Sequence, residues 1–190
     1  MERSRGNAAL FWPIIAVIVV ADYITKRMAV DALVPQRLPH EVFGEAVRLT
    51  LVYNPGAAFG LHLGQYSRWI FTALTVAALV ILWRLFRATR PGDTVRTLAL
   101  ALVCGGAIGN LIDRLRSPLG VVDFIDVGIG DMRWPTFNVA DMAVSTGAFL
   151  LAYVLWGEDR EAVAHAAPAG GGGAPVAPVA PVAPDARELP

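Results

Sequence analysis

The chain has few of the residues that support cysteine, histidine or lysine chemistry. Its 190 residues contain one cysteine, Cys104, one lysine, Lys26, and three dispersed histidines. A single cysteine excludes an internal disulfide, and no Cys/His cluster has the spacing of a metal site. Cys104 lies in an apolar run without a nearby histidine, so we expect it to be a packing residue and not a nucleophile. We therefore expect neither a metal nor a cofactor.

An excess of charge of either sign is also missing. The formal net charge is zero at pH 7, so the chain lacks the basic footprint of a nucleic-acid partner. Apolar residues are abundant instead, at 55% of the sequence, and the mean hydropathy is +0.52. This composition is too apolar for an ordinary soluble domain of this length and predicts an integral membrane protein.

Long apolar segments support this prediction. A helix needs about 20 such residues to cross a bilayer. Four segments reach this length, at about residues 8–30, 67–86, 95–115 and 136–156. We expect the first to be retained and not cleaved as a signal peptide, because Asp22 and Lys26-Arg27 follow its apolar stretch and no small-residue cleavage site ends it.

Arginines near the ends of these segments predict the orientation. They precede the first segment and crowd the connection between the second and third, at Arg3, Arg5, Arg84, Arg87, Arg90 and Arg96. Both regions should be cytoplasmic by the positive-inside rule, as should both termini. The loops 31–66 and 116–135 then lie outside. They also contain arginines, but acidic residues accompany them, and we expect Asp126 and Asp131 to be solvated loop charges.

Both outer loops contain strand-forming sequence. Residues 47–53 and 120–127 are rich in Val, Leu, Ile and aromatic residues, which predicts a small extracytoplasmic sheet over the helices. The predicted fold is an all-α membrane protein with four transmembrane helices and this β-sheet, in one domain spanning residues 1–160. Residues 166–190 are rich in Gly, Pro and Ala, and we expect a disordered cytoplasmic tail there.

A repeated polar pattern lies near the predicted outer ends of the last two helices. Asn-x-x-Asp occurs at Asn110–Asp113, followed by Arg114, and again at Asn138–Asp141, with Asp123 in the loop between them. Each pattern alone is also typical of polar contacts between packed helices. Carboxylates in a membrane-embedded chain are costly, however, and mark functional sites by default.

Two of these carboxylates are the better candidates for chemistry. Asp113 has Arg114 beside it, and we expect both to support the structure. Asp123 and Asp141 have no basic neighbour in sequence. Two carboxylates held close together cannot both ionise easily, so one keeps a proton and can act as an acid while the other acts as a general base.

Asp22 and Lys26 lie toward the outer end of the first helix. Their i,i+4 spacing with the acid first favours an ion pair. This pair either neutralises itself, or braces the site or touches a substrate. A Ser–Lys peptidase remains an alternative, because Ser145 lies about one turn inward of Asp141. Two further alternatives are a small proton-coupled transporter, with carboxylates spaced through the membrane depth, and a non-catalytic scaffold.

Five motifs, in order and in register over about residues 8–157, resemble bacterial lipoprotein signal peptidase, also called signal peptidase II. The motifs are Asp22-Tyr-Ile-Thr-Lys26, Asn54-Pro-Gly-Ala-Ala-Phe-Gly60, Gly105-Gly-Ala-Ile-Gly-Asn-Leu-Ile-Asp-Arg114, Val121-Val-Asp-Phe124 and Phe137-Asn-Val-Ala-Asp141. Five motifs in register are far more specific than any single one.

The resemblance implies an intramembrane aspartic endopeptidase of the bacterial inner membrane, with its active site near the outer face. Its substrates would be diacylglyceryl-modified prolipoproteins within membrane lipid, cut just before the lipidated cysteine, and globomycin-type inhibitors would occupy the site. Asp123 and Asp141 match the catalytic pair. The positions that shape or support the site match Asp22, Lys26, Asn54, Asn110, Asp113, Arg114 and Asn138. The resemblance also implies a short periplasmic amphipathic helix.

Overall fold

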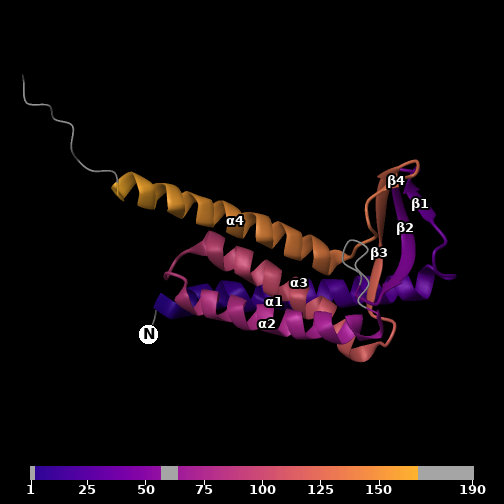
Figure 1. The fold of residues 1–190 in the computed structure, drawn as a ribbon, viewed down its shortest axis with the longest axis horizontal. Coiled ribbons are helices and arrows are strands. Elements are labelled where there is room, and N and C mark those ends of the chain that lie inside the picture. Colours follow the sequence, from indigo (N-terminus) through magenta and orange to yellow (C-terminus); the bar gives the residue numbers. More distant parts are fainter. Residues whose placement is uncertain (1–2, 57–63, 167–190) are drawn as a thin grey trace, which may run out of the picture.

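Four long helices lie side by side and form most of the structure (Figure 1). The computed structural model describes residues 3–56 and 64–166. The helices are α1 (Arg3–Ala32), α2 (Ser67–Ala88), α3 (Thr94–Arg116) and α4 (Val139–Ala166). Each contains a stretch that is long and apolar enough to cross a membrane, which confirms the predicted fold class. α3 is central, because it packs against each of the other three helices.

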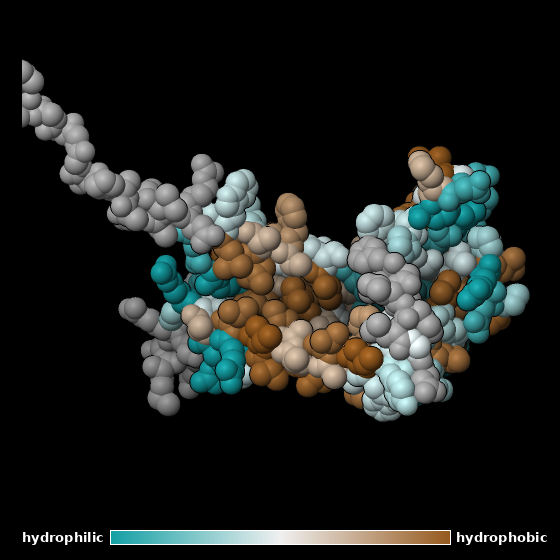
Figure 2. All heavy atoms as spheres, viewed as in Figure 1, coloured by the Kyte–Doolittle hydropathy of each residue, from teal (hydrophilic) through white to brown (hydrophobic). Residues whose placement is uncertain are grey.

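The outer surface of the bundle is apolar along the helices. Figure 2 shows hydrophobic side chains gathered over the helical section, with hydrophilic ones toward its two ends. Exposed side chains of this surface include Val17, Met28, Leu74, Val80 and Phe149. An apolar surface of this extent would be unfavourable in water and is suited to contact with lipid acyl chains.

A core of buried aromatic and aliphatic side chains fills the part of the bundle away from the sheet. The rings of Phe11 and Phe86 stack there with centroids 3.8 Å apart. Leu100 and Cys104 of α3 are buried in the same cluster. The prediction that Cys104 packs in the core is therefore confirmed.

A four-stranded antiparallel sheet covers one end of the bundle (Figure 1). Its strands, in spatial order, are β1 (His40–Phe43), β2 (Val47–Asn54), β3 (Val121–Ile129) and β4 (Met132–Arg133). The two loops predicted to lie outside thus pair with each other through β2 and β3, and the predicted small sheet over the helices is present. Leu51, Val122 and Phe124 pack on Ala29 of α1 and on Leu33 directly after it, which fixes the sheet against the helices.

The prediction that Asp126 is a solvated loop charge is wrong. Its side chain is only 11% exposed. Arg133 donates from Nε to Oδ1 at 2.8 Å, and Arg48 donates from Nε to Oδ2 at 3.3 Å. The hydroxyl of Thr50 also donates to Oδ2. Asp126 is therefore a structural anion that joins β2, β3 and β4, while Asp131 is exposed as expected.

Two glycines of α3 allow the close approach of neighbouring helices. A Cβ atom at Gly106 would collide with the carbonyl oxygen of Ala140 in α4. A Cβ atom at Gly109 would lie 2.6 Å from Oδ2 of Asp22 in α1. Gly109 thus leaves room for the Asp22 side chain to pass α3 and reach the start of α4.

Some predictions fall outside the described residues. These are residues 57–60 of the motif that begins at Asn54, and the tail from residue 167 onward. Within the described ranges the only short helix is the 3-10 helix η1 (Gly64–Tyr66), directly before α2. The fourth helix begins at Val139 and not at residue 136, because Asn138 acts as its N-cap.

Candidate active site

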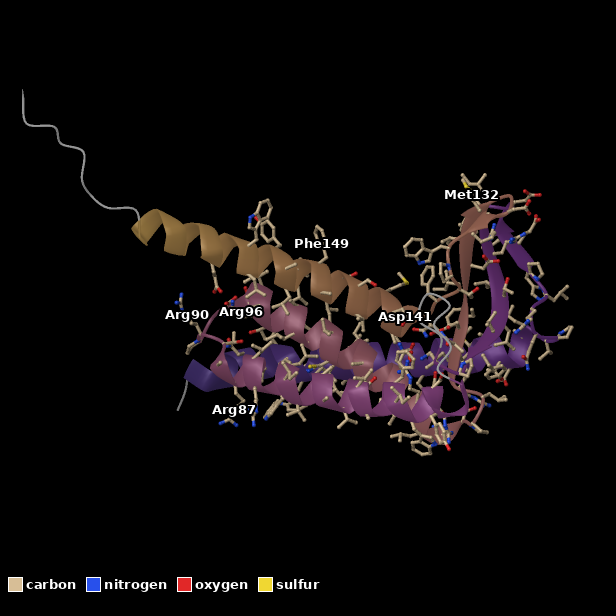
Figure 3. The ribbon with its side chains drawn as sticks, viewed as in Figure 1. Arg87, Arg90, Arg96, Met132, Asp141 and Phe149 are labelled. Carbon is tan, nitrogen blue, oxygen red and sulfur yellow. The ribbon has the colours of Figure 1, made fainter. Side chains whose placement is uncertain are left out.

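The polar residues predicted from the sequence meet at the sheet end of the bundle. Asp22 and Lys26 come from α1. The others are Asn54 of β2, Asn110, Asp113 and Arg114 of α3, Asp123 of β3, and Asn138 and Asp141 at the start of α4. Figure 3 shows Asp141 where α4 meets the sheet. Side chains that are distant in sequence thus form one hydrogen-bonded group.

Asp123 and Asp141 line one cavity of about 290 Å³, here called the aspartate cavity. Asp123 accepts a hydrogen bond from the Asn54 amide at 3.2 Å and one from the Asn138 amide at 2.7 Å. Asp141 accepts from the Asn110 amide at 2.7 Å. Each carboxyl group is therefore oriented by amide donors and also faces a space that a peptide could enter.

Asn138 connects Asp123 with Asn110, the residue that binds Asp141. It is fully buried, and its amide nitrogen lies within hydrogen-bond distance of Asp123, of the Asn110 oxygen at 3.1 Å and of the Val122 carbonyl at 3.2 Å. A buried amide with this many partners is held in one orientation. Asn138 therefore fixes β3 relative to α3 and α4.

The second Asn-x-x-Asp pattern forms a capping box. The Asn138 side chain accepts from the backbone N–H of Asp141 at 2.9 Å, and the Asp141 side chain accepts from the backbone N–H of Asn138 at 3.2 Å. Asp22 adds a third cap, because its Oδ1 accepts from the N–H of Ala140 at 3.0 Å. The sequence prediction missed this role, although Asn followed three residues later by an acid before an apolar run is a helix-start signal.

Lys26 connects three polar side chains that lie beside Asp123 and Asp141. Its amine lies 2.8 Å from Asp22 and 2.8 Å from Asp113, and it donates to the Asn110 oxygen at 2.9 Å. The predicted Asp22–Lys26 ion pair is confirmed. Asp113 does not pair with its sequence neighbour Arg114 but binds Lys26 of α1 and the N–H of Val122. Tertiary packing brings these partners together from distant parts of the sequence.

Arg114 faces the aspartate cavity, which its neighbour Asp113 does not line. It lines the aspartate cavity together with both aspartates. Its guanidinium also lies 5.9 Å from the ring centroid of Phe71 and donates to the Asn110 carbonyl at 3.4 Å. Arg114 therefore supplies positive charge close to the two carboxyl groups.

Burial determines the protonation of Asp123. The residue is 3% exposed. This burial, followed by the nearby charge of Asp141, raises the pKa of Asp123 to about 7. The hydrogen bonds from Asn54 and Asn138 and the charge of Lys26 act in the opposite direction. Asp123 therefore carries a proton through most of the range below neutral pH.

The alternative of a Ser–Lys pair is not supported. Ser145 does line the aspartate cavity. The Lys26 amine, however, is occupied by Asp22, Asp113 and Asn110 and is almost fully buried. All three partners lie in the polar group beside Asp123, and none of the contacts of the Lys26 amine is with Ser145. Residues 3–56 and 64–166 also contain no group of three His, Cys, Asp or Glu side chains placed to hold a metal.

The fold and the site together define a membrane-embedded protein with two aspartates facing one cavity at the end of a four-helix bundle. A sequence model described as "Signal peptidase (SPase) II" matches residues 14–156. The chain therefore belongs to the signal peptidase II family. Together with the four spanning helices, this makes it a multi-pass peptidase of the bacterial inner membrane.

Individual relatives agree with this assignment. The lipoprotein signal peptidase of Burkholderia thailandensis is 41% identical over 157 residues, which cover 80% of this chain and 92% of the relative. That of Paraburkholderia phytofirmans is 42% identical over 153 residues, covering 79% and 86%. Two solved structures described as a bacterial membrane enzyme, each 30% identical, superpose with TM-scores of 0.69 and 0.65. They cover 77% and 75% of this chain and 87% and 89% of their own.

Proposed function

We propose that this protein is an aspartic endopeptidase that removes signal peptides from prolipoproteins, with Asp123 and Asp141 as its catalytic pair. Its substrates carry a diacylglyceryl group on the cysteine that follows the scissile bond. The proposal is supported most directly by the two carboxyl groups that line one cavity, where the burial of Asp123 favours its protonated form. This is the division into acid and base that metal-free peptide hydrolysis requires.

The two aspartates have distinct roles in this proposal. Asp141, held by Asn110 and by its own helix start, takes a proton from a water molecule whose oxygen attacks the scissile carbonyl carbon. Asp123 donates its proton to the carbonyl oxygen. When the tetrahedral intermediate collapses, the carbon–nitrogen bond breaks and the proton held by Asp141 passes to the leaving amine. The hydroxyl formed from the carbonyl oxygen returns its proton to Asp123 as the new carboxylic acid forms, so both aspartates regain their starting states. Arg114 stabilises the negative charge that develops beside both groups.

The remaining residues hold this pair in place. Asn54 and Asn138 orient Asp123, while Asn110 orients Asp141. Lys26, Asp22 and Asp113 fix α1, α3 and α4 relative to one another. Aromatic side chains of Phe71, Trp134 and Phe137 line the same cavity and offer apolar contacts for a signal peptide or for a cyclic peptide inhibitor such as globomycin.

The proposed orientation places the sheet and the aspartate cavity at the outer face, with both termini in the cytoplasm. Arg84, Arg87 and Arg90 lie at the end of the bundle away from the sheet, and Figure 3 shows two of them there. The positive-inside rule assigns that end to the cytoplasm. Lipid anchoring of the substrate cysteine then holds the scissile bond near the cavity and provides much of the positioning.

The distribution of carboxylates disfavours a proton-coupled transporter. Within the four described spans, the acidic residues lie near the sheet end, except for Glu158 near the opposite end of α4. A relay through the membrane would need carboxylates between these levels.

The experiment that tests the proposal is a cleavage assay with purified protein in detergent. A diacylglyceryl-modified precursor should be cut before its lipidated cysteine, and globomycin should block the reaction. A matched precursor that was never lipidated should be cut far more slowly, because it lacks the anchor. Equal cleavage of both precursors would contradict the proposed substrate class, and movement of a solute without cleavage would favour a transporter.

The pH dependence of cleavage is a second prediction. Because the proton on Asp123 is needed for catalysis, and burial raises its pKa to about 7, the turnover rate should fall as the pH rises through about 7. The Asn54 hydrogen bond lowers this pKa, so Asn54→Ala should move the alkaline decline to higher pH. Turnover under saturating substrate, measured between about pH 5 and pH 9, tests this. A flat profile across neutrality, or a decline moved to lower pH in Asn54→Ala, would exclude Asp123 as the acid.

A further inference from the structure

Two arginines at the sheet end border a second cavity, away from the aspartates. Arg48 and Arg133 are bound to one buried carboxylate, and Arg114 lines the aspartate cavity. Arg27 of α1 and Arg116 of α3 instead line the second cavity. Arginine is disfavoured at the outer end of spanning helices by the positive-inside rule, so this pair requires a separate explanation.

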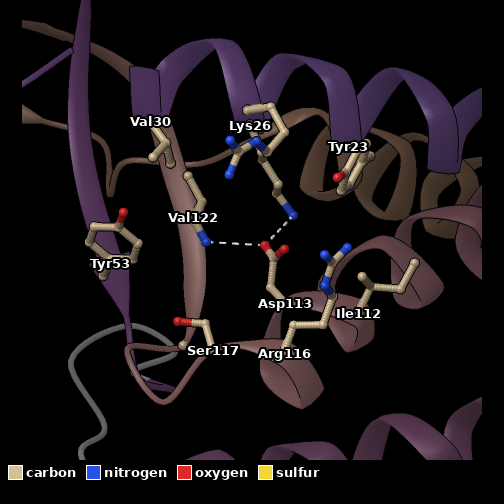
Figure 4. Close-up of a pocket in the computed structure, with 11 residues that line it drawn as sticks. Tyr23, Lys26, Val30, Tyr53, Ile112, Asp113, Arg116, Ser117 and Val122 are labelled. Carbon is tan, nitrogen blue, oxygen red and sulfur yellow. Dashed lines mark hydrogen bonds and ion pairs between the residues drawn. The ribbon is translucent and has the colours of Figure 1, made fainter. Parts of the chain in front are cut away.

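The second cavity has a volume of about 200 Å³ and opens between α1, α3 and β3 (Figure 4). Its charged lining residues are Lys26, Arg27, Asp113 and Arg116, and the hydroxyl groups come from Tyr23, Tyr53 and Ser117. Figure 4 shows Lys26 reaching from α1 toward Asp113, and Arg116 extending from α3 toward α1. The cavity is also lined by Val122, the neighbour of Asp123 in β3. Successive strand side chains point to opposite faces, so this space is distinct from the aspartate cavity.

The charges that face this cavity favour an anion. Asp113 is its one lining carboxylate, and Oδ2 of Asp113 is already bound to Lys26 and to the N–H of Val122. Arg116 lies over the ring of Tyr23, 5.6 Å from its centroid. Among the described residues it has no ion-pair partner.

Arg27 has only a weak competitor for an anion. Its guanidinium lies 3.6 Å from Asp31, and both side chains are more than half exposed. Such a pair contributes little and is easily exchanged for another anion. Both arginines are therefore available to a ligand.

The surface below the cavity is suited to acyl chains. Val20 lies on the same face of α1 as Tyr23 and Arg27, which follow it by three and seven residues, and it is 54% exposed. Ile112, four residues before Arg116 on α3, lines the cavity itself. An apolar surface thus adjoins two cations and the hydroxyl of Tyr23, which matches the order of acyl chain and headgroup in a phospholipid.

We propose that this cavity binds the phosphate of an anionic phospholipid of the membrane, with Arg27 and Arg116 as the phosphate ligands. The acyl chains lie against α1 and α3 near Val20 and Ile112. A zwitterionic headgroup fits less well, because its ammonium group would meet three cations and one carboxylate that is already bound. Arginine suits this role because its planar guanidinium can donate two hydrogen bonds to one phosphate.

The test measures lipid binding to the full chain in nanodiscs of phosphatidylcholine that contain increasing amounts of phosphatidylglycerol. Native mass spectrometry then counts the phosphatidylglycerol molecules that stay bound to the protein after it is released from the nanodisc. Each arginine is expected to contribute roughly fivefold in affinity. Arg27→Gln/Arg116→Gln should therefore weaken the retention roughly thirtyfold, while Arg27→Lys/Arg116→Lys should keep most of it.

The matched control is Arg84→Gln/Arg87→Gln, which removes the same charge from exposed positions of α2 at the end of the bundle away from the sheet. It should retain the lipid as the natural sequence does. Equal losses in both double variants would mean non-specific attraction and would overturn the proposal, as would displacement of the lipid by millimolar inorganic phosphate. If the first double variant fails to fold, Arg116→Gln alone, which removes no ion pair, should still lose roughly fivefold. The binding readout is independent of peptide cleavage.

Discussion

Asp123→Asn is expected to lower cleavage of a lipidated precursor by about a thousandfold or more, and Asp141→Asn should do the same. A positioned acid or base typically contributes two to four orders of magnitude, and the proposed mechanism uses both aspartates in the same transition state. The measurement is a single-turnover assay on purified, membrane-extracted protein, so that differences in expression and insertion do not affect the rate.

The loss in Asp123→Asn should not come from unfolding. Because burial raises the pKa of Asp123 to about 7, its ionisation destabilises the fold as the pH rises toward that value. Neutral asparagine avoids this cost, although it exchanges one acceptor for a donor opposite Asn54. We expect an unfolding midpoint close to that of the natural sequence at pH 8.

The matched control for this experiment is Asp131→Asn. It makes the same chemical change at an exposed position in the turn after β3, and it should leave both cleavage and stability unchanged. Near-full activity in either Asp123→Asn or Asp141→Asn would show that the catalytic pair is assigned incorrectly.

Most of the fold could be predicted because its signals are local. The four spans follow from uninterrupted apolar stretches, and β2 and β3 follow from strand-forming residues in the two outer loops. The meeting of polar residues at one level also followed from their positions near helix ends. These inferences need only the sequence within each element and the thickness of a membrane.

The partners of the charged residues could not be predicted in this way. Asp113 and Arg114 are adjacent in sequence, but adjacent helical residues point in different directions, and Lys26 is the partner of Asp113. Asp126 is buried because the β2–β3 register places it opposite Arg48, and Arg133 folds back from β4. Both outcomes depend on tertiary contacts between segments far apart in the chain.

The two Asn-x-x-Asp patterns also differ in their partners, although their sequences look alike. They have identical spacing, but the first lies inside the last two turns of α3 and the second lies at the start of α4. Only at a helix start can both side chains bind the free backbone N–H groups. Asp141 thus has one oxygen bound by its own helix start and the other by Asn110, which fixes its direction toward the cavity.

Lys26→Met is expected to cause the largest loss of stability among single substitutions at this site. Lys26 is 3% exposed and neutralises Asp22 and Asp113, whose side chains are 2% and 17% exposed. Removing one partner of a buried ion pair leaves an uncompensated charge and typically costs about 3 to 5 kcal/mol. The measurement is the unfolding free energy in detergent, with Arg84→Met as the control that removes an exposed cation.

A second substitution separates this charge effect from a loss of packing. Asp22→Asn keeps an oxygen for the N–H of Ala140 but removes one of the two carboxylates. If uncompensated charge is the cause, Lys26→Met/Asp22→Asn should recover about 1 to 3 kcal/mol relative to Lys26→Met alone. Strict additivity of the two changes would mean that Lys26 acts mainly by filling space. Because Asn110 contacts both Lys26 and Asp141, the charge explanation also predicts that this rescue restores stability without fully restoring cleavage.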